Sequence, residues 1–252
     1  MLIFRMFRRA GAVFFVLATL THPAPADEAR VAVAANFTEA AKEIGAAFEK
    51  NTPHRAVFSF ASTGTLYTQI SQGAPFDVFL AADQARPGKA LDEGYAIAGS
   101  GFTYAMGKIA LYSRDVTLVA GRETLNQSRF EKIALANPLT APYGTAAVQT
   151  MTALGLLDSL RPKFVQGNNI AQTYQFVDTG NAALGFVALS QIAGHNEGSR
   201  WIVPENLYDP IRQDAVLLKR GETNEAARAF LDFLRSLDAG VIKAEFGYGS
   251  GD

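Results

Sequence analysis

Short β-prone segments alternate with amphipathic helical segments along almost the whole chain, and this alternation is the strongest constraint that the sequence places on the fold. Residues 30–35 predict a strand, and the apolar residues that follow it recur at helical spacing. Residues 56–60 and 78–82 predict two further strands, each followed by a helix that should end at a glycine, Gly73 or Gly94. Such alternation is typical of an α/β protein with mostly parallel sheets.

The alternation continues in the second half of the chain with a different sequence. Strands are predicted at 108–112, 132–136, 164–166, 184–188 and 215–218, and helices at 145–154, 170–180, 227–234 and 241–246. Because open sheets rarely exceed about ten strands, we expect two lobes in place of one sheet. The chain should cross near residues 103–106 and return near 208–214. This division gives lobe I as residues 27–105 plus 214–252 and lobe II as residues 106–213.

The first 26 residues carry the pattern of a secretory signal peptide. Three arginines within the first nine residues precede an uncharged apolar run over residues 10–20, and the sequence A-P-A at 24–26 supplies small residues for cleavage. A membrane-spanning helix needs about 20 apolar residues, and this run is shorter. We therefore expect residues 1–26 to be removed before Asp27 and the protein to reach the periplasm.

The rest of the chain has no cysteine and a small net negative charge. Three of the 23 basic residues and none of the 24 acidic residues lie in the expected signal peptide, so no basic surplus is left for nucleic acid or an anionic membrane. Without cysteine, neither a disulfide nor a lipid-bearing residue after the signal peptide is available. We expect a monomer that depends on its hydrophobic core.

Motifs of common enzyme classes are missing from the sequence. No phosphate-binding loop, dinucleotide fingerprint or nucleophile elbow occurs. The three histidines, at positions 22, 54 and 195, lack the spacing of metal ligands. The sequence therefore predicts no catalytic residue, no cofactor and no metal ion held directly by side chains.

Polar residues and glycines recur where predicted strands turn into helices. These junctions are Asn36, Ser62-Thr63-Gly64, Pro142-Tyr143-Gly144 and Gly167-Asn168-Asn169. The carboxyl ends of parallel strands form the ligand-binding edge of a sheet, and helix N-termini carry free N–H groups that favour anions. Any one junction is also explained as an ordinary helix N-cap. Two junctions from each expected lobe together predict an anion site in a closing cleft.

Several of these segments resemble the periplasmic molybdate-binding proteins of ABC importers. In the first half the similar segments are AANFT (34–38), FASTG (60–64) and GAPFDVFLAAD (73–83), and in the second half ANP (136–138), PYG (142–144) and LGFV (184–187). The resemblance covers essentially all of the chain after the signal peptide. It implies a two-lobe periplasmic binding protein (venus-flytrap) fold, with molybdate or tungstate as the ligand and an ABC importer permease in the membrane as the partner.

The resemblance also implies which residues hold the anion. Asn36 would donate from its backbone and side-chain amides, and Ser62 from its hydroxyl and backbone N–H. Tyr143 and Ile170 would each donate one backbone N–H from the second lobe. The sequence departs from the family pattern at Asn36, where many members have serine, and at Ala188, where several have a tyrosine that contacts the ligand.

Other functions remain open at this point. A cage of donors suits a dianion without protons, whereas phosphate keeps a proton near neutral pH and requires an acceptor. Asp83 is a carboxylate close in sequence to the candidate residues, but we interpret it as a helix-start residue and not as this acceptor. The alternatives are a binding protein for sulfate, phosphonate or chelated iron, an enzyme on the same scaffold, and a structural or adhesive exported protein.

Overall fold

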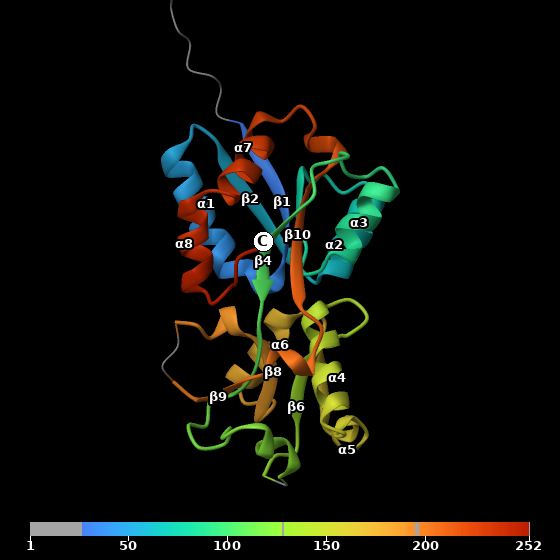
Figure 1. Ribbon diagram of the computed structural model, residues 1–252, viewed down its shortest axis with the longest axis vertical. Helices are drawn as coiled ribbons and strands as arrows, with labels where there is room; N and C mark the ends of the chain where they lie inside the picture. Colours follow the sequence, from blue (N-terminus) through green and yellow to red (C-terminus); the bar gives the residue numbers. More distant parts are fainter. Residues whose placement is uncertain (1–26, 128, 195–196, 252) are drawn as a thin grey trace, which may run out of the picture.

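The computed structural model describes residues 27–127, 129–194 and 197–251, which form two lobes stacked along the long axis of the molecule (Figure 1). The expected signal peptide, residues 1–26, lies outside the described residues. Within the described part of the chain, no helix is long and apolar enough to cross a membrane.

The first lobe contains a five-stranded sheet with the order β2-β1-β3-β10-β4. Its strands are β1 (Glu28–Ala34), β2 (Arg55–Ala61), β3 (Val78–Leu80), β4 (Phe102–Gly107) and β10 (Ile211–Leu217). Strands β1, β2 and β3 are parallel, whereas β10 runs antiparallel to both of its neighbours. The reversal follows from connectivity, because β10 brings the chain back from the second lobe.

The second lobe repeats this arrangement with the order β7-β6-β8-β5-β9. Its strands are β5 (Ile109–Ser113), β6 (Ile133–Ala136), β7 (Phe164–Gly167), β8 (Leu184–Ala188) and β9 (Ser199–Ile202). Strands β6, β7 and β8 are parallel, and β5 runs antiparallel to β8 and β9. The predicted α/β fold with two lobes is confirmed, and both sheets are mixed, with the antiparallel pairs contributed by strands next to the crossings.

Helices cover both faces of each sheet (Figure 1). They are α1 (Thr38–Asn51), α2 (Thr63–Ser71), α3 (Ala85–Asp92), α4 (Pro142–Ala153), α5 (Leu157–Leu160), α6 (Ile170–Asp178), α7 (Glu225–Leu234) and α8 (Leu237–Glu245). The described residues also form short 3₁₀ helices, namely η1 (Ala35–Phe37), η2 (Arg122–Asn126), η3 (Arg161–Lys163), η4 (Leu189–Gln191), η5 (Glu205–Leu207) and η6 (Lys219–Gly221).

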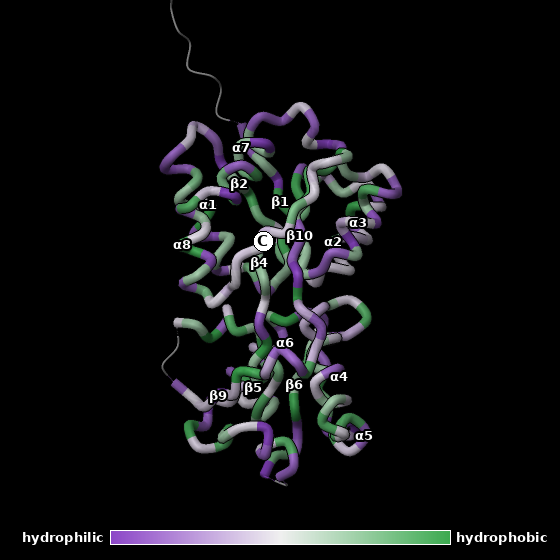
Figure 2. The backbone as a smooth tube through the Cα atoms, viewed as in Figure 1, coloured by the Kyte–Doolittle hydropathy of each residue, from purple (hydrophilic) through white to green (hydrophobic). Residues whose placement is uncertain are grey.

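The alternation of side chains along β1 explains why the sheet of the first lobe has helices packed on both of its faces. Val31 and Val33 pack into one core with α1, α7 and α8, whereas Ala32 packs into a second core with α2 and α3. Successive side chains of a strand point to opposite faces, so a strand buried on both faces is apolar throughout. Figure 2 shows apolar colouring along the inner strands and mixed colouring on the outer helices.

Two segments cross between the lobes. Lys108 joins β4 to β5, and the return path runs from the end of β9 at Ile202 to the start of β10 at Ile211. Residues 103–106, near which the sequence predicts the crossing, belong to β4, and the crossing follows directly at Lys108. They become a strand because they pair with β10, more than 100 residues later in the chain.

Candidate functional site

The carboxyl ends of strands from both lobes meet around one small cavity, whose lining residues are almost all buried. The first lobe contributes residues that directly follow β1, β2 and β3, and the second lobe contributes residues that follow β6 and β7. The lining residues are Ala34, Ala35, Asn36, Ser62, Thr63, Ala82, Ala141, Pro142, Tyr143 and Ile170. The structure thus brings together all four residues that the sequence singled out, Asn36, Ser62, Tyr143 and Ile170.

Asn36 lies in η1, between β1 and α1, and is buried. Its side-chain Nδ2 donates to Gln213 Oε1 over 2.8 Å and to the Tyr248 hydroxyl over 3.1 Å. Its carbonyl oxygen accepts hydrogen bonds from Ser190 Oγ at 2.8 Å and from the Tyr248 hydroxyl at 2.7 Å. Both side-chain hydrogens therefore have protein acceptors here, and the donor that Asn36 has left for a guest is its backbone N–H. The side-chain donation that the resemblance implies would have to replace one of these two hydrogen bonds.

Ser62 is the N-cap of α2. Its Oγ accepts a hydrogen bond from the Thr65 backbone N–H over 3.4 Å and lies 2.7 Å from Thr65 Oγ1. When Thr65 donates in this second contact, the Ser62 hydroxyl hydrogen is free for a guest in the cavity. Ser62 can therefore cap the helix and donate to an anion at the same time. The N-cap explanation and the ligand explanation do not exclude each other.

The second lobe presents two helix N-termini to the cavity. Tyr143 is the second residue of α4, after Pro142 at the first position, and Ile170 is the first residue of α6. The first N–H groups of a helix have no acceptor within the helix, and they lie at its electropositive end. The α6 N-cap is Asn169, whose side chain accepts from the Gln172 N–H over 2.9 Å. Asn169 therefore fixes the start of the helix, and Ile170 lines the cavity.

No charged side chain lines the cavity in the part of the chain that the structure describes. Burial raises the pKa of Tyr143, so its phenol stays neutral. Asp83 is ion-paired with Arg86 and also accepts the Arg86 backbone N–H over 2.9 Å. These contacts place the Asp83 carboxylate at the start of α3, outside the cavity lining. The site can thus offer an anion hydrogen-bond donors without an ionised partner.

The two lobes touch at the rim of the cavity. The Gly64 N–H donates to the Thr140 carbonyl oxygen over 2.9 Å, and Arg86 Nη2 donates to the Leu139 carbonyl oxygen over 2.9 Å. Both hydrogen bonds join the first lobe to the loop after β6. With them in place the cavity residues are almost completely shielded from solvent, as in a closed clamp.

Ala188 lies at the end of β8 and is fully buried. Its N–H donates to Gln191 Oε1 over 2.9 Å, and it is not among the residues that line the cavity. Among the described residues there is also no group of three or more histidine, cysteine, aspartate or glutamate side chains that could hold a metal ion. His22 and His195 lie outside the described residues.

Three further residues, which the sequence did not single out, surround Asn36: Ser190, Gln213 and Tyr248. A signal for Gln213 was present: Ile211, Gln213 and Ala215 alternate along β10 and share one buried face. A polar residue in an apolar face of a strand needs a buried hydrogen-bond partner. Sequence alone does not identify that partner.

Known proteins are similar to this chain over nearly its whole length, including both lobes and the cavity residues. Residues 29–249 match the family of bacterial extracellular solute-binding proteins. The molybdate-binding protein ModA of Rhodobacter capsulatus is 52% identical over 241 residues, which cover 95% of this chain and 96% of that protein. ModA of Azotobacter vinelandii is 50% identical over 230 residues, covering 90% and 91%. The solved structure of the Azotobacter vinelandii periplasmic molybdate-binding protein matches with a TM-score of 0.84 at 38% identity, covering 89% of this chain and all of that one.

Proposed function

Because the chain belongs to the bacterial extracellular solute-binding proteins and, among them, to the ModA molybdate-binding proteins, we propose that it binds molybdate between its two lobes and delivers it to an ABC importer. Proteins of this family are the binding components of transporters and not enzymes. The chain acts outside the cytoplasm, as its family does.

The observation that carries the proposal is a cavity in which neutral donors, and no charged side chain of the described residues, form the lining. A fully deprotonated tetrahedral dianion such as molybdate accepts hydrogen bonds through all its oxygens and donates none. Donor groups fixed at helix N-termini can compensate its lost hydration, because hydrogen bonds to charged groups contribute about 1.5–3 kcal/mol each. No lining residue offers an ionised acceptor for the proton of a phosphate.

The proposed anion contacts are the backbone N–H groups of Asn36, Tyr143 and Ile170 and both donors of Ser62. These groups approach the cavity from both lobes, so the ligand would stabilise the closed form. Tungstate has the same shape and charge as molybdate and is proposed as a second ligand. Sulfate is smaller and would leave some donors of a rigid cage unpaired.

The finer organisation of the chain is part of the same proposal. Residues 1–26 would be removed as a signal peptide, which releases a monomer that begins at Asp27. Lobe I would comprise residues 27–105 and 214–252, and lobe II residues 106–213. The crossing at Lys108 supports this division to within a few residues, since the sheet of the first lobe includes β4 as far as Gly107 and β10 from Ile211 onward.

Calorimetric titration of the protein that starts at Asp27 tests the proposal directly. We expect tight binding of molybdate and tungstate, with much weaker binding of sulfate and phosphate. Small-angle scattering on the same samples should show a smaller radius of gyration with molybdate. Displacement of molybdate by equimolar sulfate would favour a sulfate-binding protein, and no heat with any oxyanion would overturn the anion site.

A further inference from the structure

Gln213 is a fully buried polar side chain that lies beside the cavity without lining it. It belongs to β10, the strand that returns the chain to the first lobe. Its Oε1 accepts hydrogen bonds from Asn36 Nδ2 over 2.8 Å and from the Tyr104 hydroxyl over 3.1 Å. Its Nε2 donates to the Tyr143 hydroxyl over 3.1 Å. One side chain thus contacts a candidate anion donor residue from each lobe.

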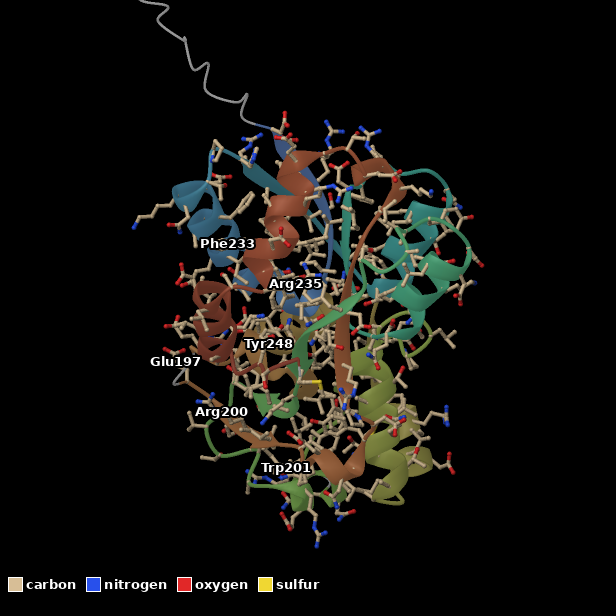
Figure 3. All side chains as sticks on the ribbon, turned by 45° about the horizontal axis from the view of Figure 1, so that its top comes forward. Glu197, Arg200, Trp201, Phe233, Arg235 and Tyr248 are labelled. Atoms are coloured by element: carbon tan, nitrogen blue, oxygen red, sulfur yellow. The ribbon has the colours of Figure 1, made fainter. Side chains whose placement is uncertain are left out.

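The contacts of Gln213 differ in whether they cross between the lobes. Tyr104 lies on β4, in the same sheet as β10, so its hydrogen bond joins two groups of one rigid body. Tyr143 lies on α4 of the second lobe, so its hydrogen bond joins the two lobes. A second crossing lies nearby, where the Tyr248 hydroxyl is 2.9 Å from Ser190 Oγ (Tyr248 is labelled in Figure 3).

Gly107, at the end of β4, provides independent evidence that this contact is built into the fold. A β-carbon at position 107 would collide with the Tyr143 hydroxyl and would lie 2.5 Å from Gln213 Nε2. The φ angle of Gly107 is not in the left-handed region, so backbone conformation does not require glycine here. The Tyr143 hydroxyl oxygen and Gln213 Nε2, which join the lobes, fill the space that a side chain at position 107 would need.

We propose that Gln213 is a positioning residue for the oxyanion site, which acts by linking Asn36 in one lobe to Tyr143 in the other when the clamp closes. It does not touch the anion. Its side-chain amide fixes the Asn36 side chain through the acceptor end and the start of α4 through the donor end. The backbone N–H groups of Asn36 and Tyr143 are thereby held at the separation that the anion requires. This inference rests on the proposed function.

Two buried tyrosines provide a matched pair of variants that tests the inference. Tyr143→Phe removes the hydroxyl that accepts from Gln213 Nε2. Because this contact joins the two lobes, its loss leaves Nε2 without an acceptor in the closed form only. Tyr104→Phe removes an equally buried hydroxyl from the other end of Gln213, where Oε1 keeps the hydrogen bond from Asn36. Gln213→Met removes both ends and keeps a side chain of similar size.

The measurements are the dissociation constant for molybdate by calorimetry and the melting temperature without ligand. We expect Tyr143→Phe and Gln213→Met to weaken molybdate binding about tenfold. In the closed form, Tyr143→Phe leaves Gln213 Nε2 without its acceptor, and Gln213→Met removes the hydrogen bond between the lobes. Tyr104→Phe should lower the melting temperature without ligand and leave the dissociation constant within about twofold of wild type. In the double variant Tyr143→Phe/Gln213→Met, the loss should be smaller than the sum of the two single losses, since both variants remove the contact between Gln213 and Tyr143.

Two other outcomes would overturn the inference alone, and a third would overturn the proposed function as well. Wild-type affinity in Tyr143→Phe and Gln213→Met, with lower melting temperatures, would mean that the contact is structural only and would overturn the inference while the proposed function stands. Equal affinity losses in Tyr104→Phe and Tyr143→Phe would also overturn it, because the crossing would then have no special effect. Absence of molybdate binding by the wild-type protein would overturn the proposed function and, with it, the inference.

Discussion

The backbone N–H of Gly64 donates to the carbonyl oxygen of Thr140 across the cleft, and a β-carbon on Gly64 would lie 3.0 Å from Thr140 Cα. The first turn of α2 therefore meets the loop after β6 at a distance that only glycine allows without a shift of the backbone. The contact lies next to Ser62 and Thr63, which line the cavity. Closure of the clamp and the formation of the anion site thus depend on the same short segment.

Gly64→Ala should weaken ligand binding while it leaves the ligand-free protein at least as stable. The added methyl group disfavours the closed form by about 1–3 kcal/mol, as overpacking does. In the open form it replaces a helical glycine and improves helix propensity by up to about 1 kcal/mol. Calorimetry and thermal melting measure the two effects separately. Gly88→Ala in α3 is the control, because no atom lies within 4 Å of its added β-carbon; unchanged affinity in Gly64→Ala would contradict the prediction.

Ser62→Ala should weaken molybdate binding by about 1.5–3 kcal/mol, or roughly ten- to a hundredfold, because a donor to a charged guest is lost. Loss of the N-cap should also lower stability without ligand by about 0.5–2 kcal/mol. Ser236→Ala removes a serine N-cap, that of α8, which does not line the cavity. It should show the stability loss alone. Identical behaviour of the two variants would mean that Ser62 is a cap and not a ligand.

Ala188→Tyr should destabilise the protein and should not tighten ligand binding. The Ala188 side chain is fully buried at the end of β8 and does not reach the cavity. A tyrosine there must displace packed neighbours, which costs about 1–3 kcal/mol or more. Chemical unfolding measures the loss of stability, and titration measures the affinity. A stable variant with higher molybdate affinity would show that the site has room for the tyrosine of other family members.

Stability should fall as the pH rises above about 10, the ordinary pKa of tyrosine. Burial raises the pKa of Tyr104, Tyr143 and Tyr248 in the folded protein. Above pH 10 the unfolded chain therefore releases phenolic protons that the folded chain retains, so ionisation favours unfolding. The stabilising contribution is complete below pH 10 and is lost above it. Urea unfolding between pH 8 and 11 measures the slope, which Tyr104→Phe should reduce; an unchanged slope in that variant would contradict the assignment.

Local patterns in the sequence determined the fold class and the position of the site residues along the chain. The α/β alternation follows from two periodicities, and the glycines after helices mark their ends, as at Gly73 and Gly94, both with positive φ. Local patterns marked the junctions that contain Asn36, Ser62 and Tyr143, whereas Ile170 and the donor role of each residue came from the resemblance to a known family. Each of these residues follows the strand that positions it.

Tertiary structure alone decided the features that depend on contacts between distant residues. Residues 102–107 form β4 because β10 pairs with them, and this pairing leaves no periodic signal in a segment of six residues. The Asn36 side chain has Gln213 and Tyr248 as partners, 177 and 212 residues away in sequence. Local propensity cannot encode such pairings, because they form only when β10 and the C-terminal segment join the sheet that contains β1 in the folded first lobe. Which groups of the site touch a guest and which ones hold those groups in place is therefore decided only when the chain is folded.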